Sequence, residues 1–389
     1  MLNFSLLTYP ISFFILLFSH FSAANTMDHE YRIIVDANST KTSLYLYQYD
    51  YNNALPYNLK TILKSHAEPG IDSIDNDDID AYLNSIFHDE LAFTLDSLTG
   101  DDSKRAGASI LNGIQFYSTG GMRALDKTDQ NEKNRVIKKW VDDWLISHFA
   151  NPEKTNVDIR TLPGEEEAAY EWVAANYLET FFNGELSGVA TINGASTQIA
   201  YPNTKSANVM VQVANKQYAI TGRSFPLGQN VISEKLSSED GCYLRGYKFS
   251  ATGNYVRCRV AAKAMINNLI DNSVDYADKI SDFRLYANFY YSAKFLDIEQ
   301  NYSLLTLQKA AENYCSTPWE DAKEDHPDVN KNYLALYCMG AAFQGALLED
   351  TYFLSNTNQT FIPESSISNF KVTWPIGALA SQNLQLLNH

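Results

Sequence analysis

Short apolar strands that end in turns of small polar residues organise the first 200 residues of the chain. Residues 33–35 are apolar and lead into Asp36, a turn of hydroxylated residues follows, and 44–47 alternates leucine with tyrosine. This pattern predicts strand–turn–strand. A further strand is predicted at 114–117, ending in the turn 118–121, and residues 188–201 again predict strand–turn–strand.

Helical periodicity takes over between and after these strands. Apolar residues at helical spacing predict an amphipathic helix over 131–148, and the break at Pro163-Gly164 precedes a second helix over 165–182. The C-terminal half is predicted to be mainly helical, with one internal strand and a closing strand–helix segment. Its helices are expected near 260–272, 303–313 and 332–349, its strand near 282–288, and its closing segment over 371–379.

The two strand–turn–strand segments align without gaps, about 155 residues apart. The alignment pairs Asp36 with Thr191, Asn38 with Asn193, Ser39 with Gly194, Thr42 with Thr197 and Ser43 with Gln198. Chance similarity of two small-residue turns is the alternative to an internal repeat. A repeat predicts a duplicated, two-lobed α/β fold whose hairpins face each other across a cleft. We assign lobe I to 30–150 plus 355–389, and lobe II to 151–354.

Composition and charge limit the possible ligands. The 389 residues are 45% hydrophobic and 13% aromatic, which is enough for a large core, and the formal net charge is -16. Such a surface repels nucleic acid and anionic lipid. A polyphosphate substrate would need local neutralisation, so a divalent metal cofactor (Mg, Ca or Mn) is expected for any phosphate chemistry.

The N-terminal segment predicts export. An apolar run at 11–18 leads to the small residues 22–24, which is typical of a signal peptide over 1–24, although the absence of Lys or Arg before the run leaves an uncleaved anchor as the alternative. We expect a secreted or periplasmic protein, monomeric and free of the membrane after cleavage. The pattern Asn38-Ser39-Thr40 would accept a glycan in a phosphate-contacting turn, which favours a bacterial export route.

Four cysteines behind an export signal predict two disulfides. Three connectivities are open. The pairs Cys242–Cys258 and Cys315–Cys338 close the shortest loops.

Several polar residues suit phosphate chemistry. The turns 36–43, 118–121 and 191–198 expose backbone N–H groups and hydroxyls that could form anion nests. Asp36 could hold a hydrated metal, or could simply cap its turn. Glu167 could deprotonate a water as general base, but Glu165 and Glu166 are equally placed to interact with the helix dipole.

Five segments together resemble a known family. In order and spacing, the first four are similar to the apyrase-conserved regions of the ecto-nucleoside triphosphate diphosphohydrolases, and the last to the fifth region. They are DANSTKTSLYLY (36–47), YSTGGMRAL (117–125), PGEEEAAYEWVAANYL (163–178), GVATINGASTQIAYP (188–202) and YANFYYSAKF (286–295). Trp374-x-x-Gly377 and the Tyr337-Cys338 helix also fit.

The resemblance implies an actin-like, ribonuclease-H-like duplicated fold and in-line attack of water on a nucleotide's terminal phosphate. Glu167 would be the base, Ser196 and Gln198 would hold the water, and Tyr352 would stack on the nucleotide base, unless it is a core tyrosine. Arg123 fits a structural ion pair as well as a phosphate contact. The implied phosphate-binding residues are Ser39, Thr40, Lys41, Thr42, Thr119, Arg123, Gly194 and Ala195.

The sequence also departs from the family pattern. The fourth region normally begins with Asp, which shares the metal with the Asp of the first region through waters, but Thr191 stands there. A hydroxyl cannot supply the missing charge, so we expect the metal, held by Asp36 through water and by Thr191 as a weakened position, to bind less tightly than in the family. The predicted function is stepwise hydrolysis of nucleoside tri- and diphosphates. The alternatives are a catalytically weakened or inactive nucleotide-binding effector and, less well matched, an exopolyphosphatase-like or sugar-kinase-like enzyme.

Overall fold

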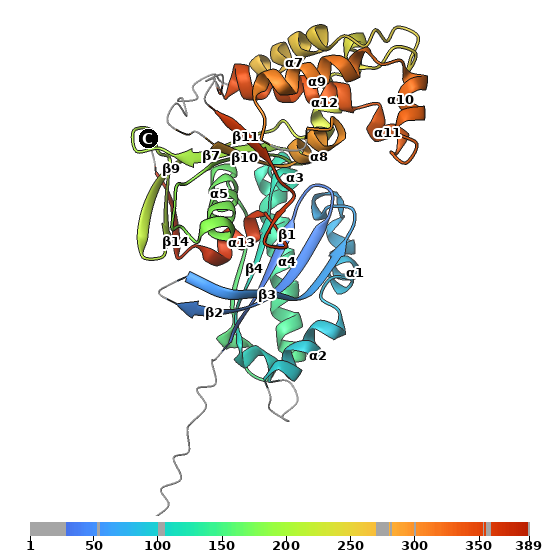
Figure 1. Cartoon of the computed structure of the whole chain (residues 1–389). Helices are drawn as coiled ribbons and strands as arrows, with labels where there is room; N and C mark the ends of the chain where they lie inside the picture. The colour runs from blue at the N-terminus through green and yellow to red at the C-terminus, as the bar shows by residue number, and fades with distance from the viewer. Residues whose placement is uncertain are drawn as a thin grey trace, which may run out of the picture.

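The computed structural model of the chain describes residues 29–52, 55–99, 106–269, 280, 282–298, 301–352, 354 and 359–387. Two large β-sheets form two lobes, and a layer of helices covers the upper one (Figure 1). The predicted signal peptide, 1–24, lies outside the described residues. Among those residues, no helix has the length and apolar character needed to span a membrane.

Lobe I contains a five-stranded sheet in the order β3-β2-β1-β4-β5. Central strand β1 is almost wholly buried because its apolar run packs against helices. The strands are β1 (Glu30–Ala37), β2 (Thr42–Asn52), β3 (Leu55–Ala67), β4 (Leu111–Ser118) and β5 (Asn156–Thr161). The helices are α1 (Ile79–Asn84), α2 (Asp89–Leu98), α3 (Gly120–Ala124) and α4 (Lys127–His148). The predicted helix at 131–148 is thus confirmed.

Lobe II contains a seven-stranded sheet in the order β11-β10-β6-β7-β9-β8-β14. Its strands are β6 (Gly188–Ile192), β7 (Thr197–Pro202), β8 (Val209–Val213), β9 (Lys216–Phe225), β10 (Asp282–Ala287), β11 (Thr360–Pro363) and β14 (Asn383–Leu386). A separate two-stranded sheet pairs β12 (Ser366–Ile367) with β13 (Phe370–Lys371).

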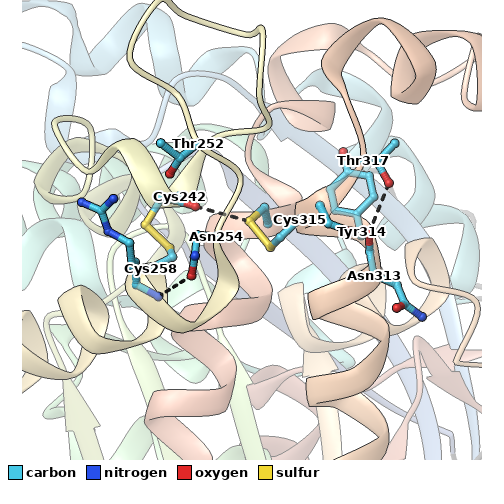
Figure 2. The surroundings of a disulfide bond; sticks show 12 residues. Cys242, Thr252, Asn254, Cys258, Asn313, Tyr314, Cys315 and Thr317 are labelled. Atoms are coloured by element: carbon cyan, nitrogen blue, oxygen red, sulfur yellow. Dashed lines mark hydrogen bonds between the residues drawn. A yellow bond between two sulfur atoms is a disulfide. The ribbon is translucent and has the colours of Figure 1, made fainter.

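The helical layer of lobe II buries its own large apolar cluster. It contains α6 (Gln229–Lys235), α7 (Tyr255–Leu269), α8 (Asn288–Phe295), α9 (Leu304–Ser316), α10 (Trp319–Asp325), α11 (Lys331–Leu334) and α12 (Tyr337–Gly345), which continues as a π-helical segment (Ala346–Thr351). The disulfides are Cys242–Cys258 and Cys315–Cys338, so the predicted local pairing is confirmed. Both lie in this layer, where Cys242, Cys258 and Cys315 are close neighbours (Figure 2). Cys338 Sγ is 3.9 Å from the Gly241 carbonyl oxygen.

Helices α5 (Gly164–Thr180) and α13 (Trp374–Ala380) pack against each other between the two sheets (Figure 1). Gly377 allows their close crossing, because a Cβ there would lie 1.7 Å from the Tyr170 carbonyl oxygen. Helix α5 also packs on β7 and β9, and α13 contacts β1 and β3, so the pair links the lobes.

Strand pairing supports the predicted internal repeat. In the first hairpin Asp36 pairs with Ser43, and in the second Thr191 pairs with Gln198, as the gapless alignment requires. Both turns close with the same backbone hydrogen bond, from Asn38 N to Lys41 O and from Asn193 N to Ser196 O. The two hairpins are therefore built alike.

Sheet membership differs from the predicted lobe boundaries at two places. Strand β5, which lies beyond residue 151, belongs to the first sheet, and β11 and β14, which lie within 355–389, belong to the second. The C-terminal segment therefore returns helix α13 to lobe I, while its strands β11 and β14 extend the second sheet. Strand β14 pairs with β8 at the edge of the second sheet. The hydrophobic pattern of a strand indicates which of its faces is buried, but it does not identify the neighbouring strand.

Candidate active site between two hairpins

The tips of the two hairpins meet between the lobes. A Cβ placed on Gly194 would lie 2.9 Å from Ser39 Oγ, and one placed on Gly120, in the third predicted turn, would lie 2.9 Å from Ser196 Oγ. All three turns predicted as anion nests therefore come together. The absence of side chains at Gly120 and Gly194 permits this close approach.

A cavity of about 90 Å³ lies beside the meeting hairpins, large enough for several water molecules or a hydrated cation. Four predicted site residues line it: Asp36, Thr119, Glu167 and Thr191. Its other lining residues are Asn38, Glu171, Asn193, Tyr286, Ala287, Tyr290, Tyr291, Ser365, Lys371, Val372, Thr373 and Trp374. The cavity thus brings together carboxylates, hydroxyls, amides and one lysine from both lobes.

Asp36 enters the cavity from the end of β1. Its side chain is buried, and Trp374 Nε1 donates a hydrogen bond of 3.0 Å to its Oδ1. Burial raises the pKa of Asp36 to about 6, although the bond from Trp374 partly opposes that rise. The Asn38 side chain caps its own turn by accepting bonds from Thr40 N and Lys41 N. Asn38, and not Asp36, therefore caps the turn, so the Asp36 carboxylate is available to bind a cation.

Glu167 lies at the N-terminal end of α5 and is almost fully buried. Its Oε2 forms an ion pair with Arg123 Nη2 at 2.7 Å and accepts a bond from Gln198 Nε2 at 3.2 Å. Gln198 Nε2 also lies 2.7 Å from Ser196 Oγ. The predicted base and the two predicted water-holding residues therefore form one network, with Ser196 and Gln198 behind Glu167 rather than in the cavity lining.

The three consecutive acids at the start of α5 differ in their surroundings. Glu166 forms an ion pair of 2.7 Å with Arg160 from β5, and Glu165 is half-buried outside the cavity lining. Glu167 is the one of the three that lines the cavity. This placement favours Glu167 as the acid that could act on a bound water.

The structure places an unpredicted carboxylate, that of Glu171, next to Thr191. The Thr191 hydroxyl lies 2.8 Å from Glu171 Oε2, and Asn193 Nδ2 donates to Glu171 Oε1 at 3.4 Å. Burial, followed by the charge of Glu167, raises the pKa of Glu171 well above its ordinary value. A signal existed in the sequence, because Glu167 and Glu171 are four residues apart and share a helix face.

Lys371 is a second lining residue that the sequence reasoning missed. Burial of its amine and the positive charge of Lys41 lower the pKa of Lys371, while Asp36 opposes that effect. Lys41, which is not a lining residue, therefore lies within electrostatic reach of Lys371, which lines the cavity. They bring positive charge to a protein that is strongly acidic overall.

Some predicted contacts lie elsewhere. Thr42 is fully buried in β2 and is not among the residues that line the cavity. Ser39, Thr40, Gly194 and Ala195 belong to the turns that meet, whereas Arg123 is held in its ion pair with Glu167. Tyr352 is 1% exposed, its hydroxyl lies 3.3 Å from Thr197 Oγ1, and its ring packs near Phe225. It is a core residue with no ring face open to a nucleotide base.

A larger hollow adjoins the cavity and shares Tyr291 with it. It has a volume of about 400 Å³, within the range of small-molecule sites. Tyr291 and Tyr333 are 51% and 66% exposed. The hollow is lined by Gln229, Asn230, Ser233, Asn288, Tyr291, Ser292, Tyr333, Leu336, Tyr337 and Gly340.

Comparison with known proteins decides the family. The profile of the GDA1/CD39 (nucleoside phosphatase) family matches residues 22–225 and 229–387, nearly the whole chain. The chain belongs to this family. The predicted kinship with ecto-nucleoside triphosphate diphosphohydrolases is therefore confirmed, and with it the class of hydrolase.

Curated relatives of this GDA1/CD39 protein include plant and animal proteins. "Probable apyrase 3" of Arabidopsis thaliana is 24% identical over 68% of this chain and 65% of its own length. "Ectonucleoside triphosphate diphosphohydrolase 1" of Rattus norvegicus is 23% identical over 90% of this chain and 80% of its own.

Solved structures confirm the fold class. The nucleoside triphosphate hydrolase structure from Neospora caninum matches with a TM-score of 0.59 at 12% identity, over 90% of this chain and 92% of that one. A Ppx/GppA family member from Aquifex aeolicus matches with a TM-score of 0.54 at 11% identity, over 90% and 97%. The predicted two-lobed, actin-like duplicated fold is thus confirmed.

Proposed function

We propose that this GDA1/CD39 protein hydrolyses nucleoside tri- and diphosphates to lower phosphates and orthophosphate, by attack of a water activated by Glu167. The observation that carries the proposal is the cavity between the two hairpins, in which Asp36 and Glu167 face the same enclosed space. The names of the curated relatives, an apyrase and a triphosphate diphosphohydrolase, support this substrate class.

The lining residues suit a divalent cation such as Mg²⁺, Ca²⁺ or Mn²⁺. Carboxylate, hydroxyl and amide oxygens are the donors that hard cations prefer, and Asp36, Thr191 and Asn193 offer them here. Such a cation neutralises phosphate charge and withdraws electrons from the phosphorus. Asp36 would hold it through water from lobe I, fixed in orientation by Trp374.

The chain's own groups position the water and the substrate. Arg123 and Gln198 hold the Glu167 carboxylate, so its orientation is set before substrate arrives. Glu167 would take the proton of the attacking water, and Ser196 with Gln198, which lie behind Glu167, would support its carboxylate. Lys41, Lys371, Thr119 and the turn N–H groups would contact the phosphate oxygens.

The nucleoside would occupy the adjoining hollow. Tyr291 lines both spaces, so a nucleotide could span them with its phosphates toward Asp36. The exposed rings of Tyr291 and Tyr333 offer stacking surfaces, and the side-chain amides of Gln229, Asn230 and Asn288 offer hydrogen bonds to a base or ribose. This hollow replaces Tyr352 as the proposed base site.

Orthophosphate release from a panel of nucleotides tests the proposal. We expect turnover of ATP and ADP with added Mg²⁺, Mn²⁺ or Ca²⁺, and a lower KM for ATP than for inorganic tripolyphosphate, which has no nucleoside. Glu167→Ala should lower kcat about 100- to 10,000-fold while nucleotide still binds by calorimetry. Glu165→Gln, on the same helix outside the cavity, is the matched control and should keep wild-type turnover.

No turnover with any metal from folded protein would refute the proposal, and near-normal turnover of Glu167→Ala would move the base elsewhere. Equal KM values for ATP and tripolyphosphate would reject the hollow as the nucleoside site.

A nucleotide-binding effector without hydrolysis is the second candidate. Thr191 favours it, because a hydroxyl occupies the position equivalent to Asp36 and supplies no charge to a cation. Calorimetric nucleotide binding without phosphate release would select this candidate.

A further inference from the structure

Thr191 is the structural equivalent of Asp36. Each stands at the end of the first strand of its hairpin, opposite Ser43 in one case and Gln198 in the other. Each also pairs with a tyrosine of the neighbouring parallel strand: Asp36 with Tyr117, and Thr191 with Tyr286. One repeat thus directs a carboxylate toward the cavity from this position, and the other directs a hydroxyl.

Glu171 restores a carboxylate at the hydroxyl position from a different element. It projects from α5, one helical turn beyond Glu167, and its Oε2 lies 2.8 Å from the Thr191 hydroxyl. Glu171 lines the same cavity as Asp36. A symmetric site would take one carboxylate from each of the two equivalent strands. Here one carboxylate comes from strand β1 and the other from helix α5.

The charges in the cavity are incompletely balanced. Glu166 and Glu167 have arginine partners within 2.7 Å. Within the described part of the chain, no ion pair joins Asp36 or Glu171 to a Lys, Arg or His, and Lys371 lines the cavity without such a pair. Both carboxylates are at least nine-tenths buried. Burying a carboxylate without a cation is costly, so this arrangement favours a bound cation between them.

We propose that Glu171 supplies the second carboxylate of a divalent-cation site whose first is Asp36, beside the Thr191 hydroxyl that occupies the position equivalent to Asp36. This inference rests on the proposed function, which includes the divalent cation. It extends that function by assigning Glu171 as a second ligand of the cation. Thr191 then acts as a positioning residue that donates a hydrogen bond to Glu171.

A purely structural Glu171 would behave differently. Its two carboxylate oxygens accept separate bonds from Thr191 and Asn193. Glutamine keeps one acceptor oxygen and can donate from its amide to the Thr191 hydroxyl, which also has Gln198 Oε1 as an acceptor. Replacement by glutamine therefore separates a role of charge from a role of shape.

Binding of Mn²⁺ to the full folded protein provides the test, measured by electron paramagnetic resonance and calorimetry, alone and with a non-hydrolysable ATP analogue. Glu171→Gln should weaken Mn²⁺ binding about 10- to 100-fold. Glu165→Gln removes the same charge from the same helix outside the cavity and should bind Mn²⁺ within about twofold of wild type. Circular dichroism confirms folding, and Glu171→Ala serves if the glutamine variant does not fold.

A second experiment moves the negative charge from Glu171 in α5 to position 191 in β6. The double variant Thr191→Asp with Glu171→Gln should recover most of the lost Mn²⁺ affinity. Thr191→Asp alone should gain little, because it sets two carboxylates in contact. Wild-type affinity in Glu171→Gln, or no Mn²⁺ binding to wild type under either condition, would overturn the inference. Mn²⁺ binding is measured without turnover, so the two proposals can fail separately. If wild type hydrolyses no nucleotide but Glu171→Gln still weakens Mn²⁺ binding, the proposed function is rejected and the cation site is retained.

Discussion

At the scale of single residues, the cavity depends on carboxylates held in low-dielectric surroundings. Asp36 is buried beside Trp374 and faces no ion-paired cation among the described residues. Its pKa is raised from 3.8 to about 6, so the folded protein favours the protonated form more than the unfolded chain does. The site therefore carries a measurable cost in stability at neutral pH, which a bound cation would relieve.

Unfolding free energies should reveal this cost in metal-free protein. A raised acid pKa contributes stability that is fully present below the unfolded pKa, near 4, and is lost as pH rises through about 6. Asp36→Asn does not titrate. Relative to wild type, its free energy of unfolding should therefore gain about 2 kcal/mol between pH 4.5 and pH 7.5. Urea unfolding in EDTA measures the difference.

The exposed Asp328→Asn is the control, and its difference from wild type should be similar at both pH values. A pH-independent difference for Asp36→Asn would show that burial of this carboxylate is not a significant cost.

The sequence identified some of these residues and missed others for a physical reason. Asp36, Thr119, Glu167 and Thr191 were predictable because they occupy fixed places in turns or at a helix start. Glu171 lies in a helix buried on nearly all sides, so periodicity could not show which neighbours its carboxylate meets. Tyr352 failed as a base-stacking residue because its ring turns into the core of lobe II.

At the scale of elements, the hairpins and the α5–α13 pair set the geometry. The internal repeat was predictable because the two hairpins carry similar small polar residues in their turns and align without gaps. The observed strand pairing follows that alignment. The partner of β14 was not, since strand order in a sheet depends on contacts between distant segments. Helix α13 places Trp374 against Asp36, and this placement depends on the close crossing at Gly377.

Gly377→Ala tests the role of that crossing. The new methyl would lie 1.7 Å from the Tyr170 carbonyl oxygen, which is backbone and cannot rotate away, so the helices must separate. We expect a loss of about 3 kcal/mol in the free energy of unfolding. Gly184→Ala is the matched control, because its nearest neighbour would be 3.5 Å away, and it should change stability by less than about 0.5 kcal/mol. Equal effects of the two substitutions would show that the crossing tolerates a wider spacing.

At the scale of the whole molecule, the lobes are closed on each other. Hairpin tips touch at Gly194 and Ser39, and the ion pairs Arg123–Glu167 and Arg160–Glu166 join elements of lobe I to α5. The cavity lined by Asp36 and Glu167 therefore lies where the two lobes are held together.

A reversible cross-link between the hairpin tips tests most directly whether the reaction takes place between them. A Cβ on residue 194 would lie 2.9 Å from the side-chain atom at 39, so the thiols of Ser39→Cys with Gly194→Cys should lie close enough to form a disulfide. Orthophosphate release from ATP is measured before and after mild reduction, with wild type treated in parallel. We predict that the oxidised double variant is inactive and regains turnover when the new disulfide is reduced. Equal turnover in the oxidised and reduced forms would contradict a phosphate site between the hairpins.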